Sequence, residues 1–276
     1  MTEPSATERT SSRGDVLVRA LDQALRVQRP AALAFARRLR RVAPDATPDD
    51  LLRIAEKWYR RTAMGAGGGV GAASAIPGIG TATGIALISA EVVSFLDLTA
   101  LYALTVAELH GDATDDPDRA RALVTGILLG DRGRKLVTEF VRTRAPQTLL
   151  KNAAWGELVT EALPQVFVGE LGQRLSTSFL SKFAGTHLGG LVGKLLPFGI
   201  GAAVGALGNR ALANEVIRTA DGAFGPAPQC HVGDLSDETL AELDAANPRF
   251  QRRQAKLQAK LERGAERKQL RAKKSK

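Results

Sequence analysis

Three ionisable residues lie in unusually apolar surroundings and are the first candidates for chemistry: Glu91, Asp97 and Arg210. A charged group in an apolar segment can mark a functional site, because its pKa and its reactivity depend on that environment. It can also be one half of a salt bridge that ties two helices together, since buried charges need partners. The sequence leaves both interpretations open and favours the salt bridges.

The two acids fall within one predicted helix, residues 81–110, but on different faces of it. Helical spacing places Glu91 in a row with Phe95, whereas Asp97 shares a row with Leu101. A charge at the centre of a bilayer costs about 2.5–3.5 kcal/mol on insertion scales. Two such charges argue against a simple lipid-facing span and predict a helix buried within the protein, with its acids paired.

The segments that must position these residues are rich in Gly and Ala. Residues 62–90 carry no charge, and the step Ile76-Pro77-Gly78 predicts a turn before the long helix. The pattern G-I-G-x-A-x-G occurs after Pro77 and again, 121 residues later, after Pro197. The candidate residues of these two Gly-rich units are Pro77, Gly78, Gly80 and Gly84, and Pro197, Gly199, Gly201 and Gly205.

The two units would place an acid and a base at similar depths. At 1.5 Å per residue, Glu91 and Arg210 lie about 14–17 Å beyond Gly80 and Gly201 respectively. If the two helices pack in parallel, Glu91 and Arg210 can form a buried ion pair. The alternative is that two Gly/Ala-rich helix starts resemble each other by chance.

The motifs of the common enzyme classes are missing from the sequence. No G-x-x-x-x-G-K-[ST] string is present, and no predicted strand precedes the Gly-rich units as a dinucleotide-binding fingerprint requires. His110 and His187 have no second ligand at metal-binding spacing, and Cys230-His231 is an adjacent pair in a predicted linker. We therefore expect no catalytic residues, no metal and no cofactor.

The fold class follows from periodicity. No sustained alternation of period two occurs, so we predict an all-α fold. We expect a disordered N-terminus (residues 1–14), a single helical domain (15–220), a linker (221–235), and a short helix with a flexible basic tail (236–276). Thr47-Pro48 and Asp116-Pro117 are helix-start signals, and residues 147–184 read as helical with interruptions at Gly156, Pro164 and Gly172.

The positive charge belongs to the C-terminal tail. Residues 249–276 hold 12 Lys/Arg and two Glu, a net charge of +10, so the remaining 248 residues sum to −1 within the overall +9. Such a cluster can bind an anionic lipid surface or nucleic acid, or it can be a solvated tail. Aromatic residues for base stacking are missing after Phe250, which makes nucleic acid the weaker choice. The candidate surface-binding residues are Arg252, Arg253, Lys256, Lys260, Arg263, Arg267, Lys268, Arg271, Lys273 and Lys274.

The expected location is the cytoplasm. A single cysteine, Cys230, leaves no internal disulfide framework and fits a reducing compartment. The first 15 residues are polar and lack the apolar core of a secretory signal, so we expect no signal peptide.

Five stretches together resemble the EcsC family, a group of mainly bacterial proteins, one of them encoded beside an ABC transporter. They are AEKWYRRTA (55–63), AASAIPGIGT (72–81), AEVVSFLDLTALYALTVAELHG (90–111), LLGDRG (128–133) and LLPFGIGAAVGALGNRALANEVI (195–217). The likeness covers roughly residues 50–226. It implies a helical, membrane-associated protein with no established enzymatic activity and no agreed site residues.

Two functional hypotheses come from these observations. The first is a non-enzymatic, EcsC-like peripheral membrane protein on the cytoplasmic side, which binds a lipid surface or a membrane protein such as a transporter. The second is a soluble helical interaction or regulatory module without membrane contact. The sequence does not determine the oligomeric state.

Overall fold

The computed structural model describes residues 29–73, 81–112, 115–144, 154–189 and 200–246, together with positions 248 and 252. Regular secondary structure in these ranges is entirely helical, which confirms the predicted all-α class. The chain divides into two compact units, Met1–Val232 and Gly233–Lys276.

The larger unit begins with a helical segment at residues 29–42. Its further elements are α2 (Pro48–Ala73), α3 (Thr81–His110), α4 (Pro117–Leu129), α5 (Asp131–Arg144), α6 (Trp155–Glu157), a π-helical segment η2 (Leu158–Ala162), α7 (Gln165–Gly189) and α8 (Ile200–Phe224). In the smaller unit, a 3₁₀ turn η4 (Gly233–Leu235) precedes α9 (Asp237–Ala246).

Local capping chemistry sets two of the helix starts. Before α2, the Thr47 hydroxyl accepts a hydrogen bond from the amide of Asp50 (3.2 Å), and the Asp50 carboxylate accepts one from the amide of Thr47 (3.1 Å). Before α4, the Asp116 carboxylate accepts hydrogen bonds from the amides of Asp118 and Arg119. Both starts were predicted, because each cap satisfies amide groups that a helix end leaves unpaired.

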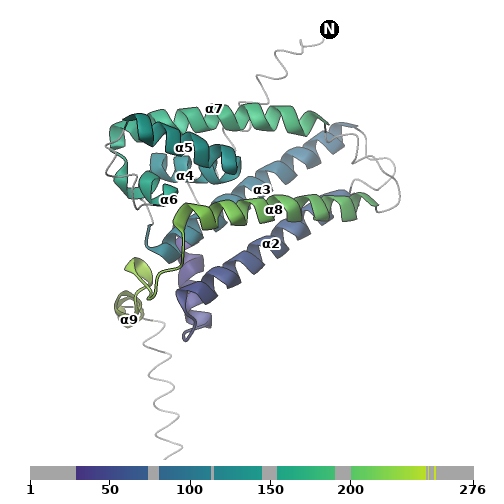
Figure 1. Ribbon diagram of the computed structural model, residues 1–276. Helices are drawn as coiled ribbons and strands as arrows, with labels where there is room; N and C mark the ends of the chain where they lie inside the picture. The colour runs from purple at the N-terminus through teal and green to yellow at the C-terminus, as the bar shows by residue number, and fades with distance from the viewer. Residues whose placement is uncertain are drawn as a thin grey trace, which may run out of the picture. The chain divides into compact units, whose positions relative to one another are not determined.

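Two groups of helices build the larger unit (Figure 1). In the first group, α2 packs along both α3 and α8. In the second, α4 packs against α7 and α5, and α6 with η2 adjoins α4 and α8. Contacts of α3 and α8 with α4 join the two groups.

An aromatic pair lies between α2 and α3. The rings of Tyr59 and Tyr102 stack with their centroids 4.5 Å apart, and both side chains are buried. The Tyr59 hydroxyl is 2.8 Å from the buried Thr99 hydroxyl, so its polar end is satisfied without water. Burial raises the pKa of both tyrosines, and they remain neutral at physiological pH.

The predicted interruptions at Gly156 and Gly172 are wrong, and so is the predicted start of the linker at residue 221. Gly156 lies inside α6, α7 continues through Gly172, and α8 continues to Phe224. One helical Gly costs only about 1 kcal/mol, which the burial of Leu171 and Leu175 on either side of Gly172 outweighs. Ala223 and Phe224 at the end of α8 are likewise buried, so tertiary packing extends the helix.

Candidate functional site

Three helices meet at one end of the larger unit, and hydrogen bonds define their relative direction. The amide group of Asn209 on α8 donates to the carbonyl of Ala63 on α2 (3.1 Å), while Arg60 on α2 donates to the side-chain oxygen of Asn214 on α8 (2.8 Å). Residue numbers rise on α2 as they fall on α8, so the two helices are antiparallel. Since α2 is also antiparallel to α3 in Figure 1, α3 and α8 run in the same direction.

This arrangement brings the uncharged ends of α2 and α8 side by side, and α3 begins at the same end of the unit (Figure 1). The last charged residue of α2 is Arg61, the first of α3 is Glu91, and the first of α8 is Arg210. Beyond these residues lie three segments without charge: 62–73 of α2, 81–90 of α3 and 200–209 of α8. At 1.5 Å per residue each segment is about 15–18 Å long. We call them the uncharged ends.

Exposed leucines and arginines stand where the charges begin. Arg61 and Arg210 are exposed, and Leu207 and Leu212 of α8 have exposed fractions of 62% and 43%. The contact between Asn209 and Ala63 places these parts of α2 and α8 next to each other. We call Arg61, Leu207, Arg210 and Leu212 the boundary residues. Two large apolar side chains beside two cations suit an interface between apolar and anionic surroundings.

The structure does not bring the predicted ion pair together as a buried unit. Arg210 is exposed, and Asp97 is half-buried with its pKa raised by burial. The side chain of Glu91 is outside the described part of the structure. Helices α3 and α8 run in the same direction, as the pairing of Glu91 with Arg210 requires. The pairing itself stays a prediction. Arg210 is exposed to solvent, so such a pair would not be fully buried.

The Gly-rich units are described only where they enter helices. Gly84 lies inside α3, and Gly201 and Gly205 lie inside α8. The predicted turn residues Pro77, Gly78, Gly80, Pro197 and Gly199 lie outside the described residues. Of the basic tail, Arg252 is described and exposed, and the other nine candidate residues also lie outside.

One helical stretch in the described ranges is long and apolar enough to cross a membrane, Val93–His110 of α3. Within the protein, 67% of this stretch is buried. Its contacts with α2, α4 and α8 give it the surroundings of a core helix. The sequence-based expectation of a buried helix agrees with this packing.

A buried acid in α3 was not singled out from the sequence. The carboxylate of Glu108 is 3% exposed and lies 3.4 Å from Nε of Arg29, which also pairs with Asp115. Glu108 follows Leu104 at helical spacing, so its place on the buried face could be read from the sequence. Its partner could not, because Arg29 is distant in the chain.

Helix α4 positions a guanidinium group at the end of η2. Arg119 donates hydrogen bonds to the carbonyls of Val159 (2.8 Å), Thr160 (3.0 Å) and Leu163 (2.7 Å). These carbonyls close a helical segment and have no further helical amide to bond, so a cation is favoured there. Arg119 therefore has a structural role.

Two groups of acids lie elsewhere in the unit. Burial, with the nearby charges of Glu161 and Glu157, raises the pKa of Asp112 to about 6. Burial, with the charge of Asp221, raises the pKa of Glu56. Among the described residues no group of three His, Cys, Asp or Glu is placed to hold a metal ion.

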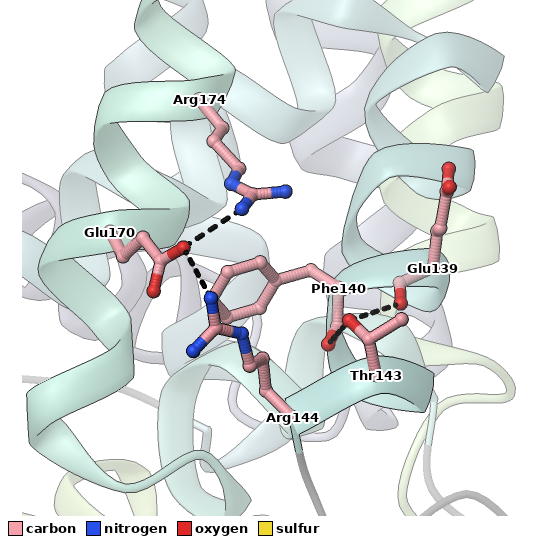
Figure 2. A network of polar contacts seen from close by, with 6 residues as sticks. All are labelled: Glu139, Phe140, Thr143, Arg144, Glu170 and Arg174. Atoms are coloured by element: carbon pink, nitrogen blue, oxygen red, sulfur yellow. Dashed lines mark hydrogen bonds and ion pairs between the residues drawn. The ribbon is translucent and has the colours of Figure 1, made fainter.

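Figure 2 shows a polar network between α5 and α7. The Glu170 carboxylate lies 2.8 Å from Arg174 and 3.3 Å from Arg144, and the Arg174 guanidinium is 5.2 Å from the centre of the Phe140 ring. Both arginines are about half exposed. The network ties the end of α5 to α7 through two half-exposed arginines that share one carboxylate, the kind of surface pairing that contributes little to stability.

Comparison with known proteins adds no relative. No family model, no curated protein and no solved structure matches the chain.

Proposed function

We propose that this protein is a non-enzymatic, EcsC-like peripheral membrane protein that binds a lipid surface, or a protein within it, on the cytoplasmic side. The observation that carries the proposal is that the uncharged ends of α2 and α8 lie side by side at one end of the larger unit, where α3 also begins (Figure 1). Their boundary is lined by exposed arginines and leucines. A soluble body with one uncharged end is suited to the boundary between water and lipid.

The distribution of charge along α2 supports the proposed membrane binding. Helix α2 carries seven charged residues among its first 14, Pro48–Arg61, and none in residues 62–73. A charged body and an uncharged end on the same continuous helix separate a surface that needs water from one that does not. The first ionisable residue along α3 is Glu91.

The basic tail adds long-range attraction. Each Lys or Arg near an anionic membrane surface contributes about 1 kcal/mol, and the contribution falls off within a Debye length. Residues 249–276 carry a net charge of +10. The tail would therefore concentrate the protein at the surface, and the uncharged ends would supply apolar contact.

A soluble helical interaction module is the alternative, and the burial of α3 favours it. The apolar stretch Val93–His110 is largely covered by protein and is not available to lipid. In that case the exposed leucines of α8 would contact a partner protein. The two proposals differ in what lies against the boundary residues.

Co-sedimentation with vesicles separates the two. The full-length protein is mixed with phosphatidylcholine vesicles with and without phosphatidylglycerol, at about 0.01 M and about 1 M ionic strength, where the Debye length is about 30 Å and 3 Å. A full-length variant with the Lys and Arg residues of 249–276 replaced by Gln is tested beside it. We expect binding to anionic vesicles that weakens, but persists, in high salt or in the variant.

The outcomes have distinct meanings. Binding that disappears completely in high salt and in the variant would assign the interaction to the tail alone. Failure of the wild-type protein to bind any vesicle at low ionic strength would refute the membrane proposal and leave the soluble interaction module.

A further inference from the structure

We propose that one exposed face of the paired helices α2 and α8 lies flat against the phosphate groups of anionic lipid headgroups. This inference rests on the proposed membrane binding and names the surface of the protein that makes the contact. We call this surface the outer face. It consists of exposed residues of both helices: Lys57 and Arg61 of α2, and Leu207, Arg210, Asn214 and Arg218 of α8.

Helical spacing forms a stripe of cations on each helix. On α2, Lys57 and Arg61 are four residues apart. On α8, Arg210, Asn214 and Arg218 follow one another at the same spacing, and the two arginines are about 12 Å apart along the axis at 1.5 Å per residue. Residues four apart lie on the same side of a helix. Each helix therefore presents its exposed cations in one direction.

Contacts between the helices place the two stripes side by side. Arg60, next to Arg61 in the chain, donates a hydrogen bond to the side-chain oxygen of Asn214 (2.8 Å). Helix α3 lies on the other side of α2, because Tyr59, two positions before Arg61, stacks on Tyr102 of α3. Helix α3 also packs against α8. The two stripes therefore share one face, which is turned away from α3.

The charge of the outer face is positive. Together with Arg60 it carries five cations, and its four exposed cations form no ion pair within the described residues. Two acids lie beside it: Glu56 is 4.0 Å from Arg60, and Asp221 follows Arg218 by three positions. Five cations and two acids sum to +3, whereas residues 1–248 as a whole sum to −1. The outer face is thus a local positive patch that complements an anionic surface.

The composition of the outer face favours lipid over nucleic acid. Leu207 has an exposed fraction of 62%, so a large apolar side chain accompanies the cations. The aromatic residues of the two helices point elsewhere, since Tyr59 and Phe224 are buried and Trp58 packs against a ring of the preceding helical segment. Base stacking needs exposed aromatic rings, which the outer face lacks. Cations with an apolar side chain suit the headgroup layer of a membrane.

Removal of charge tests the outer face. Lys57→Gln with Arg218→Gln removes two of its cations, and Arg132→Gln with Arg142→Gln removes two exposed cations from α5 as the matched control. Each cation close to an anionic membrane changes affinity about fivefold. The first pair should therefore weaken binding of the full-length protein to phosphatidylcholine–phosphatidylglycerol vesicles about 25-fold, and the control pair should change it only slightly.

A proximity measurement tests the flat orientation without removing any charge of the outer face. In a full-length Cys230→Ser protein, a fluorophore is attached at Ala211→Cys or at Gly222→Cys, which are exposed positions about 17 Å apart along α8. Val166→Cys on α7, with an exposed fraction of 78%, is the control. The same vesicles carry a nitroxide on the headgroup. We expect strong quenching at positions 211 and 222 and little at position 166.

The results distinguish failure of this inference from failure of the proposed function. If vesicles are bound but both charge pairs weaken binding equally, or position 166 is quenched as strongly as 211 and 222, the inference is overturned and membrane binding stands. Quenching at 211 without quenching at 222 also overturns the flat orientation. If the wild-type protein binds no vesicle, both proposals are overturned, and binding of a single-stranded oligonucleotide instead would assign the outer face to nucleic acid.

Discussion

Replacement of Arg119 tests whether one side chain holds the π-helical segment in place. Its guanidinium donates three hydrogen bonds, of 2.7–3.0 Å, to carbonyls at the end of η2 and beyond it. Hydrogen bonds to a charged group contribute about 1.5–3 kcal/mol each. Arg119 is half-buried, so water can replace part of this in the variant. We expect Arg119→Met to lower the free energy of unfolding by about 3 kcal/mol.

Urea unfolding followed by circular dichroism measures the effect. With an m-value of about 3 kcal/mol/M, a loss of that size lowers the midpoint by about 1 M. Arg119→Lys keeps the charge, but a compact ammonium cannot reach three carbonyls as a planar guanidinium does, so we expect about half the loss. The matched control is Arg132→Met, which removes an exposed cation from α5.

Hydrogen exchange adds a local measurement. Amides of η2 and of the turn to α7 should lose protection in Arg119→Met and keep it in Arg132→Met. Equal midpoints for the two Met variants, with unchanged exchange in η2, would show that the three carbonyls do not depend on the guanidinium.

Two further predictions concern packing and pH. Gly133→Ala places a Cβ 2.0 Å from the backbone oxygen of Gly126, so α5 must move away from α4, and we expect the free energy of unfolding in urea to fall by at least about 2 kcal/mol. In the control Gly169→Ala the added Cβ meets nothing within 4 Å, and the free energy of unfolding should rise by about 0.5 kcal/mol. Equal effects of the two substitutions would contradict the close contact between α4 and α5. The pKa of Asp112 rises from 3.8 to about 6 on folding, so the folded state keeps the Asp112 proton to higher pH than the unfolded state does. Stability should therefore fall as the pH rises from about 4 to about 6. Asp112→Asn should flatten this decline, and an unchanged pH profile of the unfolding midpoint in that variant would show that Asp112 is not its cause.

Short-range sequence signals predicted the helices whose starts are capped by a neighbouring side chain. The caps at Thr47 and Asp116 are set by side chains within three residues of the amides that they satisfy. The bounds of α3 agree with the predicted range 81–110, and α4 begins at Pro117, as the start signal Asp116-Pro117 predicted. The all-α class follows from periodicity in the same way.

The candidate site was predictable only in part. The sequence showed that residues 62–90 carry no charge and that Arg210 follows a second Gly-rich unit. It could not show that Arg210 is exposed, because exposure depends on which face of α8 packs against α2. The pairing of Glu108 with Arg29 likewise joins segments whose proximity no local pattern records.

By itself, the sequence determined the helical class, the capped helix starts, the uncharged stretches and the basic tail, because each depends on neighbouring residues or on composition. The tertiary structure alone decided that α7 continues through Gly172, that α8 reaches Phe224, and that the uncharged ends of α2 and α8 lie side by side. Burial of apolar side chains between distant segments outweighs the roughly 1 kcal/mol cost of a helical glycine.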